Sequence, residues 1–375
     1  MTFSIPTIDP SVVEKLNSPS LLVFADEVER NIEQMVATAG NVDRLRPHCK
    51  THKMTAVIKL LLQRGIQKHK AATIAESEML AEAGAVDIVF AYNPVGPNID
   101  RVVQLIKKYP QTKFTVTADH ETPLRQLSKS VSENNIVVGV MLDLDVGLHR
   151  TGISADSEGA PTLYQLINEL PGIRPAGFHV YDGHQHQPDF EERSAAVLKE
   201  WPAVLELMRK CKESGLDVPE LLCGGTPTFP IYAQIDVPEV TLSPGTSIFH
   251  DAGYGGNFPD LPFTPAAILV SRVISRPTAN RLTLDLGNKA VAADPPKGHR
   301  VYFPELPDAE QVIHNEEHLV LETDRAEQYE PGNILLGIPM HVCPTSALHQ
   351  DVAVVYGDGA TDSWEVTARN RRLSV

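Results

Sequence analysis

Between residues 44 and 243, short apolar runs rich in β-branched residues alternate with longer amphipathic segments. The clearest helical segments run up to a glycine, at Gly84 and at Gly215. Eight runs are expected to be strands: Arg44–His48, Lys70–Ile74, Asp87–Ala91, Lys113–Thr117, Ile136–Leu142, Arg174–His179, Glu220–Cys223 and Val240–Ser243. Strands separated by helices in this way predict an α/β fold, a (β/α)8 barrel of the TIM type. A doubly wound open sheet is the alternative.

The sequence changes character after about residue 250, where Pro, Gly and Asp separate short apolar runs and little looks helical. The runs expected to be strands are Ala266–Ile274, Arg281–Asp285, Leu319–Glu322, Asn333–Ile338, Val352–Tyr356 and Ser363–Thr367. This pattern predicts a second, mainly β domain. A further apolar run, Ser20–Phe24, is suited to pair into it. We therefore expect a barrel over residues 26–250 and a β-rich domain built from residues 1–25 and 251–375.

Charge and composition limit the partners of this chain. A net charge of −15 over 375 residues repels the nucleic acid backbone and an anionic membrane surface. No apolar run reaches the roughly 18 residues of a spanning helix, and no signal peptide pattern opens the sequence. The four cysteines form no CxxC pair, which argues against a disulfide framework. We expect a cytoplasmic protein that acts on a small molecule and binds neither nucleic acid nor a membrane.

The segment Arg46–Lys53, RPHCKTHK, is the densest cluster of reactive side chains. Lys50 follows the first expected barrel strand, at the end of the barrel where TIM-type enzymes carry catalytic residues. Four cationic neighbours are expected to lower its pKa: Arg46, His48, His52 and Lys53. A neutral amine of this kind is suited to Schiff-base chemistry. A solvated basic loop is the alternative interpretation.

Two glycine-rich turns follow the last two expected barrel strands. They consist of Gly224, Gly225 and Thr226, and of Pro244, Gly245 and Thr246. Glycines let backbone N–H groups approach a phosphate, and TIM-type barrels often bind phosphate after strands seven and eight. Each turn alone is compatible with an ordinary turn. Together they favour a phosphate site.

Polar residues also follow the fifth and sixth expected strands. Arg150 is placed to donate to an anionic oxygen in the barrel mouth, or else to pair with Asp143 or Asp145. The run His179–His186 holds three histidines and an aspartate, a combination suited to metal binding or proton transfer. A loop of solvated histidines is the alternative.

His341 and Cys343 form a third candidate site, in the β-rich domain. On a strand, residues i and i+2 share one face, so this imidazole and thiolate could bind one metal ion. Two protein ligands would leave coordination positions for substrate or water. A buried cysteine beside a strand histidine is the alternative.

Together these segments resemble the fold-type III pyridoxal-phosphate (PLP) enzymes, the alanine racemase-like barrel family. The closer similarity is to its metal-activated branch, the D-threonine aldolases and the eukaryotic-type D-serine dehydratases. RPHCKTHK resembles the signature RPHxKTHK of that branch, and the run Asp145–Gly152 is similar to the family segment that carries an arginine. The motifs follow one another in the family's order from residue 46 to residue 343.

The resemblance implies a role for each motif. Lys50 holds PLP as a Schiff base, Arg150 bonds its phenolic oxygen, and the two glycine-rich turns bind its phosphate. His341 and Cys343 bind a divalent metal, with Zn²⁺ favoured over Mn²⁺ or Mg²⁺ because one ligand is a thiolate. The family is homodimeric, so a homodimer is expected.

The same resemblance leaves the reaction open. A β-hydroxy D-amino acid is either cleaved to glycine and an aldehyde, or, as with D-serine, dehydrated to pyruvate and ammonia. The aldolases carry His-x-Asp and the dehydratases His-x-Cys, which favours dehydration, but the segment Ala71–Met79 is similar to bacterial proteins of aldolase type. We place the aldolase first, with His52, Tyr181 and His186 beside Lys50 as catalytic residues and Tyr181 against the cofactor ring. An amino-acid racemase and a non-catalytic PLP carrier are further alternatives, although neither needs the metal pair.

Overall fold

The computed structural model describes residues 3–375, and the chain forms two compact units. The sheet unit comprises the residues up to 34, residues 51–57 and residues 246–369. The barrel unit comprises residues 35–50, 58–245 and 370–375. No helix within the described part of the chain is long and apolar enough to cross a membrane. All four cysteines are free thiols.

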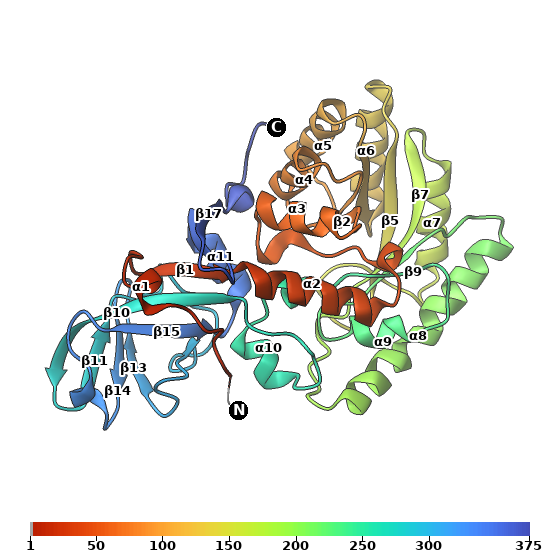
Figure 1. Ribbon diagram of the computed structural model, residues 1–375. Coiled ribbons are helices and arrows are strands. Elements are labelled where there is room, and N and C mark those ends of the chain that lie inside the picture. Colours follow the sequence, from red (N-terminus) through yellow and green to blue (C-terminus); the bar gives the residue numbers. More distant parts are fainter. Residues whose placement is uncertain (1–2) are drawn as a thin grey trace. The chain divides into compact units, whose positions relative to one another are not determined.

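The barrel unit is built on parallel strands in the order β2-β3-β4-β5-β7-β8-β9, with the short β6 beside β5 (Figure 1). The strands are β2 Lys68–Ala71, β3 Asp87–Phe90, β4 Lys113–Ala118, β5 Val138–Asp145, β6 Ile153–Ser154, β7 Ile173–Val180, β8 Leu221–Cys223 and β9 Val240–Leu242. The first expected strand is reduced to two parallel bridges, from Leu45 to Leu242 and from His48 to Lys70. Residues 45–48 therefore join the two edge strands, and the predicted α/β barrel is confirmed.

Helices connect these strands. They are α3 Thr55–Gln63, α4 Ile74–Glu82, α5 Pro97–Lys108, α6 Glu121–Glu133, α7 Gly159–Glu169, α8 Phe190–Glu213 and α9 Phe229–Ala233. Helix α2 Ala25–Ala39 precedes residues 45–48 and begins in the sheet unit. Helix α8 ends just before Gly215, as predicted, and its Asp189 cap accepts a hydrogen bond from the Glu192 N–H. Helix α5 buries one apolar stripe, with Ile99, Val102 and Leu105, whereas α4 is buried on all sides from Ile74 to Leu80.

Gly177 on β7 allows a close approach between neighbouring strands. Its φ is +97°, and a Cβ at this position would lie 1.8 Å from the carbonyl oxygen of Glu220. Only glycine fits there without moving the backbone. The residue therefore sets the position of Glu220 at the start of β8.

Arg46 lies at the amino ends of the strands, away from the carboxyl ends that carry Lys50. Its guanidinium donates to Asp87, the first residue of β3, at 2.8 Å and to Glu220 at 2.9 Å. The side chain is 1% exposed, so this is a buried ion-pair network that supports the strand ends. The prediction that Arg46 is a cationic neighbour of Lys50 is wrong, because Asp87 and Glu220 hold its guanidinium at the amino ends of the strands.

The sheet unit contains strands in the order β13-β14-β11-β10-β1-β16-β17, with β15 beside β10 and β12 beside β15. They are β1 Ser20–Phe24, β10 Ala267–Thr278, β11 Arg281–Leu284, β12 Val301–Tyr302, β13 Glu310–His314, β14 Leu319–Glu322, β15 Ile334–Pro339, β16 Asp351–Val355 and β17 Thr361–Glu365. The apolar run Ser20–Phe24 pairs antiparallel with β10 and parallel with β16, as expected from its composition. Short helices accompany this sheet: α1 Pro10–Val13, α10 Ala252–Asn257 and α11 Val342–Leu348.

Candidate active site

A pocket of about 450 Å³ in the barrel unit is lined from the carboxyl ends of its strands. Lys50 lines it from the loop after residues 45–48, Arg150 from the loop after β5, and Tyr181 from the end of β7. The Tyr181 ring centroid lies 5.7 Å from Lys50 Nζ and 4.9 Å from Arg150 Cζ. The fold therefore brings three of the predicted site residues together around one aromatic ring.

His179 and Asp143 form a buried pair in this pocket that we did not predict. They are register partners on β7 and β5, and His179 Nδ1 lies 2.6 Å from Asp143 Oδ1. Burial and then the charge of Lys70 lower the pKa of His179, which outweighs the opposing carboxylate. The imidazole is thus neutral near pH 7, with its proton on Nδ1 facing Asp143. Its Nε2 is buried and has no hydrogen-bond partner among the described residues, so a ligand in the pocket is the natural partner.

Arg150 does not form either of the ion pairs considered as alternatives. Asp143 pairs with His179, and Asp145 pairs with His149 at 2.7 Å. The guanidinium instead faces the Tyr181 ring, where it contributes positive charge to the pocket wall.

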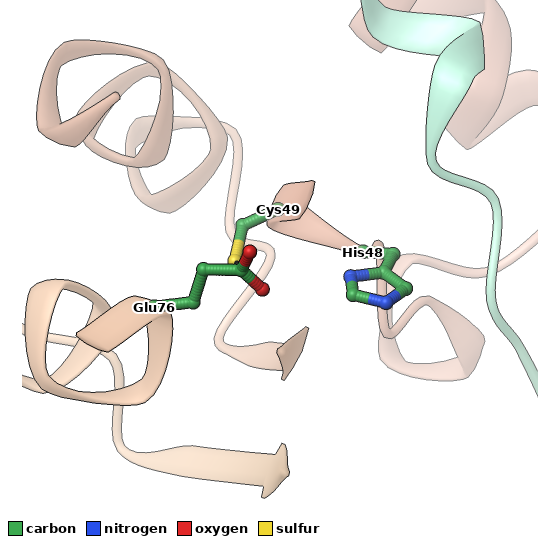
Figure 2. Close-up of side chains that lie close together, drawn as sticks. All are labelled: His48, Cys49 and Glu76. Carbon is green, nitrogen blue, oxygen red and sulfur yellow. Dashed lines mark hydrogen bonds between the residues drawn. The ribbon is translucent and has the colours of Figure 1, made fainter. Parts of the chain in front are cut away.

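His48, Cys49 and Glu76 bring possible metal-ligand atoms within 4.8 Å of one another, the only such trio among residues 3–375 (Figure 2). Each also serves the local backbone or its neighbour. Glu76 accepts a hydrogen bond from the Ala72 N–H at 2.6 Å, and its carboxylate lies 3.8 Å from Cys49 Sγ. His48 Nδ1 accepts from the Lys50 N–H at 3.2 Å. We interpret the cluster as the support that fixes the Lys50 loop against the start of α4.

The glycine-rich turn after β8 is held by its own hydrogen bonds. The Gly225 N–H donates to the Thr228 hydroxyl at 3.1 Å, and that hydroxyl donates to buried Asp182 at 2.7 Å. Burial raises the pKa of Asp182 to about 6, while Thr228 lowers it. A Cβ at Gly225 would lie 3.3 Å from the Tyr181 ring, so the turn lies directly against the wall of the pocket.

Several donors expected to hold a phosphate are already engaged. The Gly224 N–H donates to Val180, and the Gly245 N–H donates to the Thr226 hydroxyl at 3.1 Å. Because the Thr226 oxygen accepts that bond, its own hydrogen is oriented away from Gly245. A phosphate at these turns would therefore depend on donors other than the N–H groups of Gly224, Gly225 and Gly245.

His52 and His186 do not line the Lys50 pocket. His52 is fully buried in the sheet unit, where Nδ1 accepts from the Met54 N–H at 3.1 Å and the ring packs edge-on against Phe249. His186 is exposed, and its charge acts on neighbouring His184. Their catalytic assignment stays a prediction, without support from their positions.

His341 and Cys343 lie at the beginning of helix α11, and the expectation that they lie on a strand is wrong. β15 ends at Pro339, and His341 is the N-cap residue of the helix. Proline at position 344 is compatible with the first helical turn, where no intrahelical N–H bond is lost. The helix start still brings the imidazole and the thiol together, and Cys343 is among the groups that raise the pKa of His341.

The surroundings of this pair suit a cation. Burial lowers the pKa of His341, but the Cys343 thiolate and then Asp294 outweigh it and raise that pKa to about 9. His341 Nδ1 contacts the Asp294 carboxylate, an arrangement that orients metal-binding histidines and leaves Nε2 for the ion. Hydroxyl groups of Thr51 and Thr246 lie 3.2 and 3.4 Å from Cys343 Sγ. The donors present therefore fit a divalent metal of zinc type.

Comparison with known proteins agrees with this geometry. The family model described as "Alanine racemase, N-terminal domain" matches residues 23–252, and a model of a serine dehydratase domain matches residues 266–355. A D-threonine aldolase of Arthrobacter sp is 30% identical, over 95% of this chain and 93% of that protein. A D-threo-3-hydroxyaspartate dehydratase of Delftia sp. (strain HT23) is 24% identical, over 93% and 97%. The crystal structure of D-threonine aldolase from Filomicrobium marinum superposes with a TM-score of 0.87 at 27% identity, covering 95% of this chain and 96% of that one.

Proposed function

The chain is a lyase that belongs to the alanine racemase-like family of PLP enzymes. On this premise, we propose that it cleaves β-hydroxy D-amino acids to glycine and an aldehyde. The observation that carries the proposal is the pocket in which Lys50 and Arg150 both face Tyr181. The 30% identity with a D-threonine aldolase supports the choice of reaction. D-threonine is the simplest substrate of this class.

PLP, when bound, supplies an electron sink that stabilises negative charge on the substrate's Cα. Lys50 would hold it covalently through Nζ, and the Arg150 guanidinium would neutralise its phenolic oxygen. Tyr181 lies between this cationic end and the turn at Gly225, so it would pack against the ring of the cofactor. The unpartnered Nε2 of His179 would accept a hydrogen bond from a donor on a ligand bound in the pocket.

A divalent metal would be held by His341 and Cys343. It would act as a Lewis acid on the substrate hydroxyl and lower the pKa of that group. In cleavage the hydroxyl loses its proton, and its oxygen forms the aldehyde carbonyl with Cβ as the Cα–Cβ bond breaks. The electron pair of the broken bond passes to Cα, whose protonation gives glycine. The role of His341 in this scheme requires a neutral imidazole, so the metal must displace the proton that the raised pKa favours.

Dehydration is the second candidate, and Cys343 is the observation that favours it. A thiolate ligand selects zinc over manganese or magnesium, and zinc suits activation of a leaving hydroxide. In that reaction Cα loses its proton and the bond from Cβ to oxygen breaks. The same residues serve both reactions, which is why products must decide between them.

Product analysis tests the proposal. The zinc- and PLP-loaded protein is incubated with D-threonine and, separately, with D-serine. Glycine and acetaldehyde from D-threonine support the aldolase, whereas pyruvate and ammonia from D-serine, with no glycine from D-threonine, would establish the dehydratase. Glycine or pyruvate formation that survives removal of metal by a chelator would contradict the metal role of His341 and Cys343, and formation of the L-enantiomer without either product would favour a racemase. We also propose a homodimer, which sedimentation of the loaded protein would test.

A further inference from the structure

Lys70 is a second lysine in the pocket, and its position on a buried strand is unusual. It is the third residue of β2, only 3% exposed, between fully buried His69 and Ala71. Burying an ammonium group costs free energy unless an anion compensates it. Apolar residues are the ordinary occupants of such positions in parallel sheets. A lysine here therefore calls for an anionic partner.

The carboxylates near Lys70 are already paired with other groups. Asp143 and Asp182 are the two acids whose charges act on it. Asp143 is bound to His179, and Asp182 accepts the hydroxyl of Thr228. No salt bridge joins Lys70 to any acid within residues 3–375. The anion that the lysine calls for is thus not supplied by this unit of the protein.

The pocket as a whole has an excess of positive charge. Its walls carry three cationic side chains, Lys50, Lys70 and Arg150, against one carboxylate, Asp143. Lys70 Nζ lies 5.2 Å from the centroid of the Tyr181 ring, on which the other two cations also converge. A pocket of this volume and charge suits a small anionic ligand.

Asn93 supplies a neutral donor to the same pocket. It follows β3, which neighbours β2, and its Oδ1 accepts a hydrogen bond from the Thr117 hydroxyl at 2.6 Å. That bond orients the side chain so that the amide nitrogen is the group left to donate. Alanines at positions 72 and 91 leave space on this side of the pocket. Two donors from adjacent strands match the two oxygens of a carboxylate.

We propose that Lys70, assisted by Asn93, binds a carboxylate of the D-amino acid substrate, either its α-carboxylate or that of an acidic side chain. The inference rests on the proposed function, in which Lys50 and Arg150 are assigned to the cofactor. Lys70 is the cation of the pocket that remains for the substrate. Burial and the charge of Lys50 lower its pKa to about 7, and a bound carboxylate opposes that shift, so protonation and binding reinforce each other.

Ligand binding to the PLP-loaded protein tests this role without turnover of a natural substrate. Three amino compounds are titrated against the absorbance of the bound cofactor. D-alanine and D-aspartate carry a carboxylate and lack a β-hydroxyl, and D-alaninol has no carboxylate. We expect Lys70→Met to raise the dissociation constant of D-alanine or D-aspartate about 10- to 100-fold, the effect of losing a charged hydrogen bond. The dissociation constant of D-alaninol should stay within about twofold.

The two sources of the carboxylate give different patterns. If Lys70→Met weakens the binding of D-alanine and D-aspartate equally, the group bound by Lys70 is the α-carboxylate. If it weakens the binding of D-aspartate alone, that group is the side-chain carboxylate. The proposal is overturned if D-alaninol weakens as much as both acids, or if none of the three changes. Absence of cofactor absorbance in the unmodified protein would refute the proposed function itself, and with it this inference, before any amino compound is added.

Lys68→Met is the matched control, because it makes the same change two residues earlier on the same strand. Its Nζ donates to the Asp43 carbonyl at 3.0 Å and does not line the Lys50 pocket. The control should bind all three compounds as the unmodified protein does. Lys70→Arg keeps the charge and should recover part of the carboxylate affinity. If Lys70→Met does not fold, the same titrations with Lys70→Arg and Asn93→Ala decide, and unchanged carboxylate affinity in both would overturn the proposal.

Discussion

Replacement of Lys70 by methionine should stabilise the cofactor-free protein, most strongly at low pH. Burial and then the charge of Lys50 lower the pKa of Lys70 from 10.5 to about 7, against the opposing effects of Asp143 and Asp182. One pKa unit corresponds to about 1.4 kcal/mol. Below pH 7 a protonated Lys70 therefore costs on the order of 5 kcal/mol of folding free energy compared with a neutral side chain.

The pH window follows from the two pKa values. Between about pH 7 and 10.5 the unfolded chain binds a proton that the folded protein has released, so the stability of the unmodified protein rises with pH. Methionine has no proton to bind, so the advantage of the variant is largest below pH 7 and fades toward pH 10.5. The difference between the two proteins cancels the titrating groups that do not interact with Lys70, and it retains the coupling of Lys70 to Lys50, Asp143 and Asp182.

Urea unfolding of the two proteins at about pH 6, 8 and 10 measures this difference. We expect it to fall by on the order of 3–4 kcal/mol across that range. Lys68→Met controls for the loss of a lysine from the same strand. If the free energies of unfolding of the unmodified protein and of Lys70→Met change in parallel from pH 6 to 10, Lys70 is not a buried amine with a lowered pKa.

Three further substitutions test other parts of the structure. Arg46→Met leaves the partly buried Glu220 without its ion-pair partner, whereas Asp87 keeps Lys113. It should lower the free energy of unfolding by about 3–5 kcal/mol. Arg30→Met, which breaks an exposed pair, should change that free energy little, and equal effects of the two substitutions would contradict the network. Cys343→Asp should shift metal selectivity from zinc toward manganese, which elemental analysis of the bound metal would measure. An unchanged preference for zinc would contradict the assignment of Cys343 as a metal ligand. Asp182→Asn should weaken cofactor binding about tenfold, since it loosens the turn beside Tyr181, with turnover at saturating PLP preserved; an unchanged cofactor affinity would contradict this positioning role.

Much of the barrel could be predicted because its parallel strands are buried on both faces. Such strands are short continuous apolar runs, and Val138–Asp145 and Ile173–Val180 are clear examples. The positions of Arg150 and Tyr181 followed from the same pattern, since the residue after a barrel strand faces the mouth. The strand ends were harder to predict. The sequence predicts a strand that begins at Lys70, whereas β2 is Lys68–Ala71, because its two lysines interrupt the apolar pattern by which buried strands are recognised.

The features that could not be predicted depend on contacts between distant residues. The pair of His179 and Asp143 requires the register of two strands, which no local pattern specifies. Arg46 was placed beside Lys50 because they are four residues apart, yet an extended segment carries them to opposite ends of the strands. The start of helix α11 at His341 carried a local signal, a proline in the first turn, that the strand interpretation did not use.

The identity of the lysine that holds the cofactor tests the account most directly. The PLP-loaded protein is treated with borohydride, digested, and its peptides are mapped by mass spectrometry. The account predicts that the reduced cofactor is attached to Lys50 and that Lys50→Ala abolishes the adduct. An adduct found instead on Lys53 or Lys70, or one that persists in full on Lys50→Ala, would contradict it.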